Sequence, residues 1–364
     1  MPPIPPCPAE FEPKLHALQE TLRAAAPVAL GFSGGVDSTF LAAVCGFTIP
    51  DETTLMQLDS PFMGTPERAA TAQLIETQRT EDAAAVSRQQ LADSTRYIAE
   101  GVADEAAREP RVFGCSLVRL AFNPLAEDTV TANDPLRCYY CKRSGFTLVC
   151  SAAKARGIVT VFDGSNADDA LANDRPGSRA LRELGVRSPL AETGWRKNEE
   201  RACLHAWGIA TWNMPAGACL ATRVATGERI TAEKLDAVRA CEDALASHGC
   251  RQVRARLIHG TIQVEAAPEE FPLLTSETPK RCTGASVTAN VPTPLAHDIA
   301  QELSSVSGLP VRPSVLPYRR SGATQAPLDL ADSLSPPQFL LACFLTLNKL
   351  FWPTSRSKKQ ASVF

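Results

Sequence analysis

A hexapeptide near the N-terminus, Ser33-Gly-Gly-Val-Asp-Ser38, has the residue types and spacing that suit binding of a phosphate group. Gly34 and Gly35 free backbone N–H groups to face an anion, and the two serine hydroxyls can donate to phosphate oxygens. Asp37 would repel a phosphate unless Mg²⁺ lay between them, so its position predicts a metal contact. No Gly-Lys-Ser or Gly-Lys-Thr is present, which excludes a Walker-type loop. The alternative interpretation is an ordinary glycine-serine turn.

Three of the 12 cysteines are candidates for reactive or metal-binding thiols. Sulfur chemistry uses the thiolate, because the protonated thiol is a poor nucleophile. Cys219 lies close in sequence to Arg223, and Cys138 and Cys141 form a C-x-x-C pair. Such a pair can share a metal, hold a disulfide or do neither. A structural zinc would need four ligands, and the sequence contains no second C-x-x-C. The remaining cysteines are interpreted as packing residues.

Acidic residues follow an apolar run over residues 158–162, which is predicted to be a strand. In a parallel sheet the carboxyl ends of the strands line the ligand crevice, so we expect Asp163 and Asp168 to contact a ribose or Mg²⁺. Further along the chain, Lys197 can neutralise a leaving pyrophosphate. The alternative for Lys197 is an exposed lysine on a helix.

Arg254 and Arg256 lie two residues apart on an expected strand, so their side chains leave the same face. Paired guanidinium groups suit a nucleotide phosphate, and the alternative is a solvated strand face. Glu242 can hold a metal, pair with one of these arginines, or be a plain carboxylate on a helix surface. These three residues are the predicted substrate-binding residues.

Strand and helix patterns alternate around the hexapeptide. Residues 28–32 are an apolar strand pattern before it, and residues 39–45 are a buried helix pattern after it. The alternation predicts an α/β fold with a doubly wound parallel sheet. The other expected strands cover residues 53–58, 116–122, 158–162 and 208–212, and the other expected helices cover residues 14–26, 142–156 and 198–206.

The composition changes along the chain predict two domains. Residues 1–13 are Pro-rich and expected to be disordered. A nucleotide-binding domain is expected over residues 14–213, with an Ala-rich, charged helical insertion at 66–109. A smaller α+β domain is expected over residues 214–325. It would contain a helix over 231–247 with Thr231 as N-cap, a hairpin of strands 252–258 and 261–265, a helix over 295–304 and a strand over 311–318. Residues 326–364 would be a tail of unknown role.

The composition is that of a globular protein. The 364 residues contain 37 Lys and Arg against 40 Asp and Glu, a formal charge of −3, and the mean hydropathy is −0.10. This balance disfavours a broad nucleic-acid-binding surface. No apolar run approaches the roughly 20 residues that span a bilayer, and the N-terminus lacks a signal-peptide pattern. We therefore expect a cytoplasmic protein with no membrane or nucleic-acid partner, and we expect a homo-oligomer.

The hexapeptide resembles the PP-loop of the ATP pyrophosphatase superfamily, whose members cleave ATP between the α- and β-phosphates and adenylate a substrate oxygen. Further blocks over about residues 28–323 resemble one family, the LarE sulfur transferases. These blocks are Asp134-Pro-Leu-Arg-Cys-Tyr-Tyr-Cys-Lys142, Asp163-Gly-Ser-Asn-Ala-Asp-Asp169, Arg175-Pro-Gly177, Arg187-Ser-Pro-Leu190, Pro215-Ala-Gly-Ala-Cys-Leu-Ala-Thr-Arg223, Val253-Arg-Ala-Arg256 and Tyr318-Arg-Arg-Ser-Gly322.

The resemblance implies a reaction and its cofactors. Family members adenylate a carboxylate of a pyridinium mononucleotide and then replace the adenylate with sulfur, on the way to a nickel-pincer nucleotide cofactor. ATP and Mg²⁺ would bind residues 33–38 and Asp163, and Cys219 would match the cysteine that supplies sulfur. That cysteine becomes dehydroalanine in sacrificial members. Other members hold a [4Fe–4S] cluster on three cysteines that match Cys138, Cys141 and Cys219, and exogenous sulfide binds its open iron. The presence of this trio favours the cluster-dependent route.

The chain also departs from the family pattern. The insertion at 66–109 and the tail at 326–364 are unusual, and residues 322–325 read Gly-Ala-Thr-Gln where the family continues with Ser-Met-Asn. An acidic residue that some members place after the hairpin has no secure match, because Glu269 and Glu270 are only nearby. The rival functions are an amide-forming ligase similar to NAD or GMP synthetase, a tRNA thiolase, and an inactive binding protein.

Overall fold

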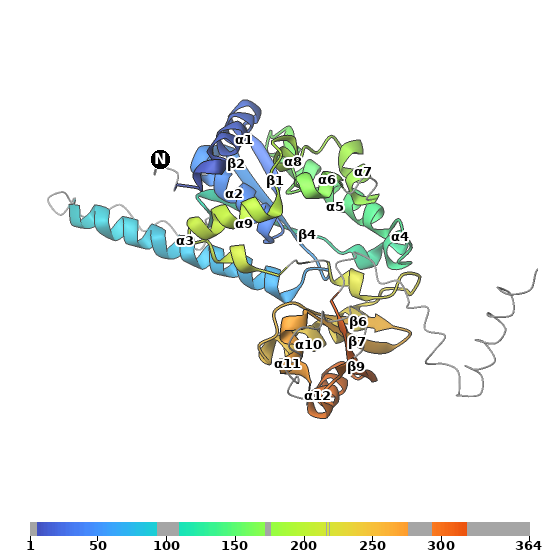
Figure 1. Ribbon diagram of the computed structural model, residues 1–364. Coiled ribbons are helices and arrows are strands. Elements are labelled where there is room, and N and C mark those ends of the chain that lie inside the picture. The colour runs from blue at the N-terminus through green and yellow to red at the C-terminus, as the bar shows by residue number, and fades with distance from the viewer. Residues whose placement is uncertain are drawn as a thin grey trace, which may run out of the picture. The chain divides into compact units, whose positions relative to one another are not determined.

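The computed structural model describes residues 6–92, 109–171, 176–215, 217, 219–275 and 293–318. These residues belong to one compact unit and form two sheets, each with helices packed against it (Figure 1). The α/β class is therefore as predicted. Residues 319–325 of the expected second domain and the expected tail lie outside the described residues, and the boundary between the two expected domains stays a prediction.

The first sheet has five strands in the order β3-β4-β2-β1-β5. Strands β4, β2, β1 and β5 are parallel, and the short edge strand β3 runs antiparallel to β4. The mostly parallel sheet is thus confirmed. The bounds are β1 Val28–Gly31, β2 Thr53–Asp59, β3 Arg111–Val112, β4 Cys115–Ala121 and β5 Thr160–Phe162.

Helices cover both faces of this sheet. Alternate residues of β1 enter different cores: Val28 and Leu30 pack with one set of helices, whereas Ala29 packs with the other. Burial on both faces explains why these strands are continuous apolar runs. One face carries α1 (Glu12–Ala25), α2 (Val36–Thr48) and α9 (Lys197–Ala206), and the other carries α5 (Arg137–Ala155) and α7 (Pro176–Glu183). Shorter helices are α4 (Asp128–Thr131), α6 (Ala167–Leu171), α8 (Pro189–Glu192) and α11 (Phe271–Leu274).

Two local predictions are wrong. Residues 208–212 do not form a strand, because residues Ala210–Asn213 are a 3-10 turn. Gly208 N–H donates to the His205 carbonyl and ends α9, and the Trp212 ring then packs on the His205 ring with centroids 4.4 Å apart. The apolar side chains of this run, Ile209 and Trp212, are therefore partly buried by folding back onto the core beside α9. Residues 9–13, expected to be disordered, form a 3-10 turn and the first turn of α1.

The expected insertion is in large part a crossover helix. Helix α3 (Thr65–Ala92) follows β2 in the chain and precedes β4, the parallel neighbour of β2, and its C-terminal part projects away from the sheet (Figure 1). Parallel strands need such a crossover, so the start of α3 belongs to the fold. Residues 93–108 of the expected insertion lie outside the described residues.

The second sheet has four strands in the order β6-β7-β9-β8. The predicted hairpin is confirmed as β6 (Val253–Ile258) and β7 (Thr261–Ala266), and β9 (Val311–Pro317) pairs parallel to β7. Strand β8 (Thr293–Pro294) completes the edge. The helix predicted after Thr231 is α10 (Ala232–Ser247), and the Thr231 hydroxyl accepts from Lys234 N at 3.3 Å, as expected of an N-cap. Helix α12 (His297–Ser307) packs with α10 against this sheet.

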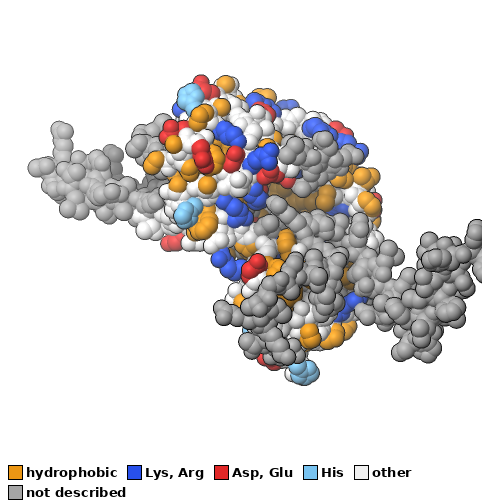
Figure 2. Space-filling model, viewed as in Figure 1, with side chains coloured by type: hydrophobic (Ala, Val, Ile, Leu, Met, Phe, Trp, Pro, Cys, Tyr) orange, Lys and Arg blue, Asp and Glu red, His pale blue; other side chains and the backbone are white. Residues whose placement is uncertain are grey.

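On the face shown in Figure 2, basic, acidic and hydrophobic side chains are interspersed among the described atoms. This distribution agrees with the balanced charge of the sequence. Of the helices that the structure describes, none combines the length and the apolar character that a bilayer crossing requires.

Candidate active site

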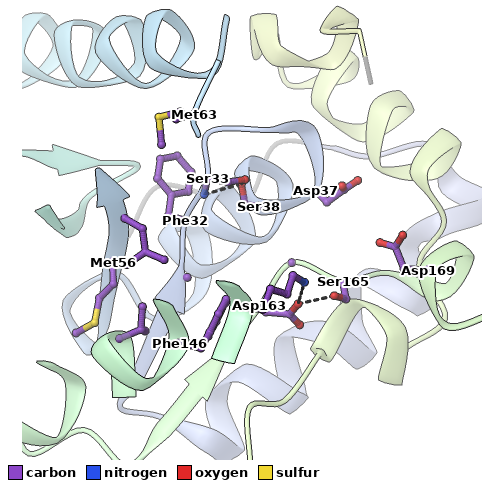
Figure 3. Close-up of a pocket in the computed structure, with 15 residues that line it drawn as sticks. Phe32, Ser33, Asp37, Ser38, Met56, Met63, Phe146, Asp163, Ser165 and Asp169 are labelled. Carbon is purple, nitrogen blue, oxygen red and sulfur yellow. Dashed lines mark hydrogen bonds and ion pairs between the residues drawn. The ribbon is translucent and has the colours of Figure 1, made fainter. Parts of the chain in front are cut away.

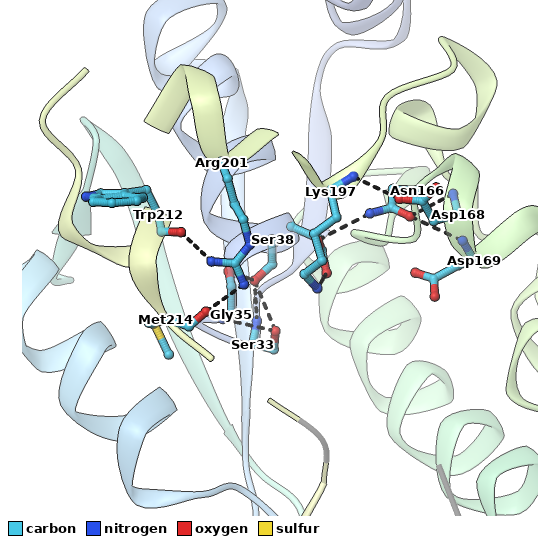
Figure 4. Close-up of polar contacts among 11 residues, drawn as sticks. Ser33, Gly35, Ser38, Asn166, Asp168, Asp169, Lys197, Arg201, Trp212 and Met214 are labelled. Carbon is cyan, nitrogen blue, oxygen red and sulfur yellow. Dashed lines mark hydrogen bonds and ion pairs between the residues drawn. The ribbon is translucent and has the colours of Figure 1, made fainter. Parts of the chain in front are cut away.

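The predicted phosphate loop lies between β1 and α2 and is held by its own serines. The Ser33 N–H donates to Ser38 Oγ at 3.3 Å, the two hydroxyl oxygens are 3.0 Å apart, and Ser38 Oγ can also donate to the Gly35 carbonyl at 3.2 Å (Figure 4). No side chain among the described residues caps the N-terminus of α2. Its first N–H groups and partial positive charge therefore face the loop, as an anion site requires.

Helix α3 packs directly on this loop. Gly34 has a φ of +76°, and a Cβ there would meet the Thr71 hydroxyl and come within 2.9 Å of the Glu67 carbonyl oxygen. Both contacting residues belong to the first two turns of α3. The Thr71 hydroxyl donates to the Glu67 carbonyl at 3.0 Å and accepts from Gln57 Nε2 at 2.9 Å. The loop conformation thus needs a glycine for its backbone angle and for the close approach of α3.

Asp37 is held by two residues from distant parts of the chain. Asn166 Nδ2 donates to Asp37 Oδ1 at 3.3 Å, and Lys197 Nζ lies 2.9 Å from Asp37 Oδ2 (Figure 4). Asn166 is itself fixed, because its Oδ1 accepts from Asp168 N at 3.0 Å and from Asp169 N at 3.2 Å. The expected lysine is therefore at the loop, as the counterion of the expected Mg²⁺ ligand. Asp168 also orients Lys197, because its Oδ2 accepts from Lys197 N at 3.1 Å.

A cavity of about 300 Å³ opens beside the loop (Figure 3). One part of its wall is polar and includes Ser33, Ser38 and Asp163, and another part is apolar and includes Met56 and Phe146. Asp163 Oδ1 accepts from Ser188 Oγ at 2.5 Å, its Oδ2 accepts from Ser165, and Lys142 Nζ lies 3.9 Å from Oδ2. The volume of this cavity suits a nucleotide, and so does the combination of an apolar wall with the predicted phosphate loop.

Glu200 is a site residue that sequence reasoning missed. It lies on α9, three residues after Lys197, and is fully buried. Burial, together with the neighbouring Asp37 carboxylate, raises the pKa of Glu200 to about 10. Glu200 is therefore a neutral acid at pH 7, next to a charged pair. A run of charged residues on a helix predicts a solvated surface, so the local sequence contains no signal of this burial.

Cys219 lies at the start of a short 3-10 turn, Leu220–Arg223, and is exposed to solvent. Its carbonyl accepts from Thr222 N at 2.9 Å, and the next residue is anchored because Leu220 N–H donates to the Phe62 carbonyl at 2.9 Å. Desolvation by the surrounding protein raises the pKa of the Cys219 thiol, against the opposing effects of the Arg137 guanidinium and the Ala221 N–H. The thiol form is favoured in the resting protein.

The C-x-x-C pair lies in the first turns of α5, five residues earlier than the helix was expected to begin. Cys138 is exposed and Cys141 is partly buried. Burial raises the pKa of Cys141 above its ordinary value, and the nearby Cys219 and Cys138 raise it further. The three thiols of the expected trio are thus neighbours. Within the described part of the chain, however, no group of three or more His, Cys, Asp or Glu side chains is arranged to hold a metal ion.

The predicted substrate residues lie in the interior. Glu242 is on α10, and its carboxylate forms two bonds with Arg223, at 2.8 Å to Nε and 3.1 Å to Nη2. Glu242 Oε1 also accepts from Ala255 N at 3.0 Å. The interpretation of Glu242 as a helix-surface carboxylate is wrong, because it links α10, β6 and the segment after Cys219.

Arg254 and Arg256 are also buried, which excludes the solvated strand face. The Arg254 guanidinium lies over the Tyr318 ring, 5.2 Å from its centroid, and burial and the nearby Arg223 lower its pKa. Arg256 Nε donates to Glu265 Oε2 at 3.1 Å, and its Nη1 donates to the Thr222 carbonyl at 3.0 Å. The two arginines are therefore held by different partners.

A second cavity, of about 170 Å³, lies beside Cys219's segment. Arg223, Glu242 and Arg254 line it together with Gly217 and the first turn of α3. Its walls thus combine buried guanidinium groups with the N-terminus of a long helix, which suits an anionic small molecule.

Two helices connect the phosphate loop with the segment that carries Cys219. The first turn of α3 contacts both, because the Glu67 carbonyl packs on Gly34 and its carboxylate packs on Gly217. Helix α9 also contacts both: Lys197 reaches Asp37, and Arg201 donates to the carbonyls of Trp212 and Met214 (Figure 4). The two expected reaction centres are therefore positioned by the same helices.

Comparisons with known proteins give three relatives, and no family model matches the chain. An uncharacterized protein of Synechocystis sp. is 33% identical over 261 residues, which are 72% of this chain and 84% of that protein. The pyridinium-3,5-bisthiocarboxylic acid mononucleotide synthase of Lactiplantibacillus plantarum is 29% identical over 44% of this chain and 58% of its own length. An uncharacterized protein of Methanocaldococcus jannaschii is 28% identical over 44% of this chain and 61% of its own length. The latter two matches thus span less than two thirds of the relatives concerned.

Proposed function

The chain belongs to the LarE family, and from that premise we propose that it is an ATP-dependent sulfur transferase with a PP-loop fold and an α+β second domain. Its substrate is a carboxylate of a pyridinium mononucleotide, and its product is the corresponding thiocarboxylate. The name of the relative from Lactiplantibacillus plantarum supports this substrate class. The observation on which the proposal rests most is that the phosphate loop and the Cys219 segment contact the same turn of α3, at Glu67.

ATP occupies the cavity beside the phosphate loop. The adenine ring packs against the apolar wall that includes Met56 and Phe146, and the phosphates lie at the N-terminus of α2, where Ser33 and Ser38 can donate to them. The carboxylates of Asp37 and Asp163 also line this cavity, and carboxylate oxygens are suitable ligands for Mg²⁺. Mg²⁺, when bound, supplies charge neutralisation between these carboxylates and the phosphates.

The first step is adenylation. The substrate carboxylate attacks the α-phosphorus of ATP, pyrophosphate leaves, and an acyl adenylate forms. Lys197 stabilises the negative charge that develops on the leaving pyrophosphate, because its ammonium group already lies at the loop. The substrate phosphate binds in the second cavity, where Arg254 supplies a buried guanidinium group and Arg223 is fixed by Glu242. Arg256 is held by Glu265 and by the Thr222 carbonyl, beside Arg223 in the sequence, and orders this segment.

The second step is sulfur transfer. Cys219 loses its proton, its Sγ attacks the acyl carbon, and AMP leaves. The Arg137 guanidinium and the Ala221 N–H favour the thiolate that this step requires. The thioester then loses the Cα proton and breaks the Cβ–Sγ bond, which leaves a thiocarboxylate and dehydroalanine at position 219.

A cluster-bound sulfide is the second source of sulfur that this chain can use. The support for it is that Cys138 and Cys219 both raise the pKa of Cys141, and that Arg137 contacts Cys138 Sγ and the carbonyl of Ala221, two residues after Cys219. A [4Fe–4S] cluster would supply a site for exogenous sulfide and allow repeated turnover. Anaerobic purification with iron quantification, followed by intact-protein mass spectrometry after turnover, separates the two sources. Bound iron with unchanged mass selects the cluster, and loss of H₂S from Cys219 selects the sacrificial route.

Replacement of Cys219 by alanine tests the proposal. We expect Cys219→Ala to release pyrophosphate in the presence of substrate and to form no thiocarboxylate, because adenylation does not use the thiol. The measurement is pyrophosphate release together with mass spectrometry of the nucleotide product. Cys150→Ala, at a partly buried cysteine on α5 away from the trio, serves as the control. Unchanged thiocarboxylate formation by Cys219→Ala would contradict the proposal, and an amide product from both the wild type and the variant would indicate an amide-forming ligase.

A further inference from the structure

Arg137 is a buried basic residue that connects the two cysteine-bearing segments. It is the first residue of α5, and only 6% of its surface is exposed. Its guanidinium donates to Asn133 Oδ1, to the Ala221 carbonyl at 2.9 Å and to Cys138 Sγ at 3.7 Å. Cys138 is one half of the C-x-x-C pair, whereas Ala221 lies two residues after Cys219. One side chain therefore contacts both segments.

Asn133 extends the same link further along the chain. It is fully buried, has a φ of +57°, and its Nδ2 donates to the Ala225 carbonyl at 2.8 Å and to the Glu228 carbonyl at 3.0 Å. Its own carbonyl accepts from Gly227 N at 2.9 Å. Arg137 and Asn133 thus supply hydrogen-bond donors to backbone carbonyls of residues 221–228. Most of this segment is not paired with a strand. Loss of a donor to such carbonyls costs more than an exposed hydrogen bond.

The charge of Arg137 acts on the other thiols as well. Among the neighbouring charges, it is the one that most lowers the pKa of Cys219, against the opposing effect of burial. It also opposes the rise that burial imposes on the pKa of Cys141. The guanidinium therefore contacts the Cys138 thiol directly and acts on the other two thiols through its charge.

We propose that Arg137 is the positioning residue that holds the Cys219 segment against the Cys138–Cys141 pair. It thereby keeps the three thiols together at the place where sulfur is transferred. The planar guanidinium can serve Cys138, Ala221 and Asn133 at once, because its donors diverge in a fixed fork. A lysine ammonium at this position would keep the charge but could not hold all three acceptors in the same geometry. The contacts of Arg137 involve no substrate. Only the purpose that we give them, sulfur transfer, rests on the proposed function.

A thiol-bridging reagent tests the arrangement without any turnover. The full-length reduced protein is treated with dibromobimane, and the bridged cysteines are identified by peptide mapping. We expect the wild type to give a bridge between Cys219 and Cys138 or Cys141. We expect Arg137→Met and Arg137→Lys to give about tenfold less of it, because a displacement on the order of one ångström is enough to separate reacting groups. Arg143→Met is the matched control, since Arg143 is an exposed arginine on the same helix, and it should bridge like the wild type.

Absence of the bridge in the wild type, or wild-type bridging in folded Arg137→Met and Arg137→Lys, would overturn the proposal. Thermal denaturation of each variant establishes folding. If Arg137→Met does not fold, Arg137→Lys decides the matter because it retains the buried charge. Pyrophosphate release by the wild type is measured separately, so that failure of the proposed sulfur transfer and failure of the positioning role give different results.

Discussion

Glu200 is a fully buried acidic residue near the phosphate loop and is neutral at pH 7. Burial and then the Asp37 carboxylate raise its pKa from about 4.5 to about 10. Its ionised form would stand in the interior beside Asp37, so the proton is needed to avoid an unpaired buried charge. Lys197 then neutralises Asp37 alone, at 2.9 Å.

This buried acid predicts a pH-dependent stability. A carboxyl group with a raised pKa favours the folded state fully below about pH 4.5, and that contribution is lost as the pH rises toward 10. At pH 7 the free energy of unfolding is lower than it is below pH 4.5 by on the order of a few kcal/mol. We therefore expect Glu200→Gln to raise the melting temperature at pH 8 and to reduce its fall between pH 5 and pH 8. The measurement is differential scanning calorimetry over this range. Glu76→Gln, at an exposed residue of α3, should leave the pH profile unchanged.

The ion pair of Arg223 and Glu242 leads to a second prediction about the stability of the fold. Its side chains are 4% and 16% exposed, so each charge depends on the other. We expect Arg223→Met to destabilise the fold by about 3–5 kcal/mol, because it leaves a buried carboxylate without its counterion. Arg223→Met with Glu242→Leu should recover most of that loss. Urea denaturation of the two variants checks this, and additive losses in the double variant would contradict the assigned pairing.

Helices α3 and α9 each contact both the phosphate loop and the segment that carries Cys219. The first turn of α3 packs on Gly34 and on Gly217, and α9 reaches Asp37 through Lys197. Their contribution is close backbone packing on α3 and charged side chains on α9, so small changes in volume at these contacts should alter function.

Gly34→Ala tests the packing of α3 on the phosphate loop. Its Cβ would meet Thr71 and Glu67, in addition to the strain of a φ of +76°. We expect ATP binding to weaken by about tenfold or more, equivalent to about 1.4 kcal/mol. Gly157→Ala is the matched control, since its φ is +74° and nothing lies within 4 Å of the added Cβ. Isothermal titration calorimetry with ATP compares them, and equal affinities in the two variants would show that contact with α3 does not matter.

The whole molecule carries a small net charge of −3 from 37 basic and 40 acidic residues. Charged side chains of both signs occur among the described atoms on the face in Figure 2. The buried arginines are in addition bound to protein groups. The near balance of basic and acidic residues disfavours a broad nucleic-acid-binding surface. The expected homo-oligomer stays a prediction.

We therefore expect no saturable binding of transfer RNA at 0.15 M salt. The physical reason is that RNA affinity at this ionic strength depends on counterion release by clustered Lys and Arg side chains. Filter binding with labelled transfer RNA measures it, with a basic RNA-binding domain as positive control. Micromolar, saturable binding would favour the tRNA thiolase alternative.

Local patterns were sufficient for most of the helices and strands and for the position of the loop between β1 and α2. The apolar run at Val28, the hexapeptide after it and the N-cap at Thr231 are properties of neighbouring residues, and all three lie where they were expected. Backbone preferences and the faces of helices and strands are set over a few residues, so the sequence alone determines them.

Burial, charge state and choice of partner were decided by the tertiary structure. Glu242 pairs with Arg223, 19 residues away in the sequence, and Glu200 lies beside Asp37 although α9 and α2 are far apart in the chain. The run at 208–212 folds back onto α9, where the Trp212 ring packs on the His205 ring and is partly buried. Desolvation and Coulomb interactions depend on whatever surrounds a group in space, and sequence separation does not limit them.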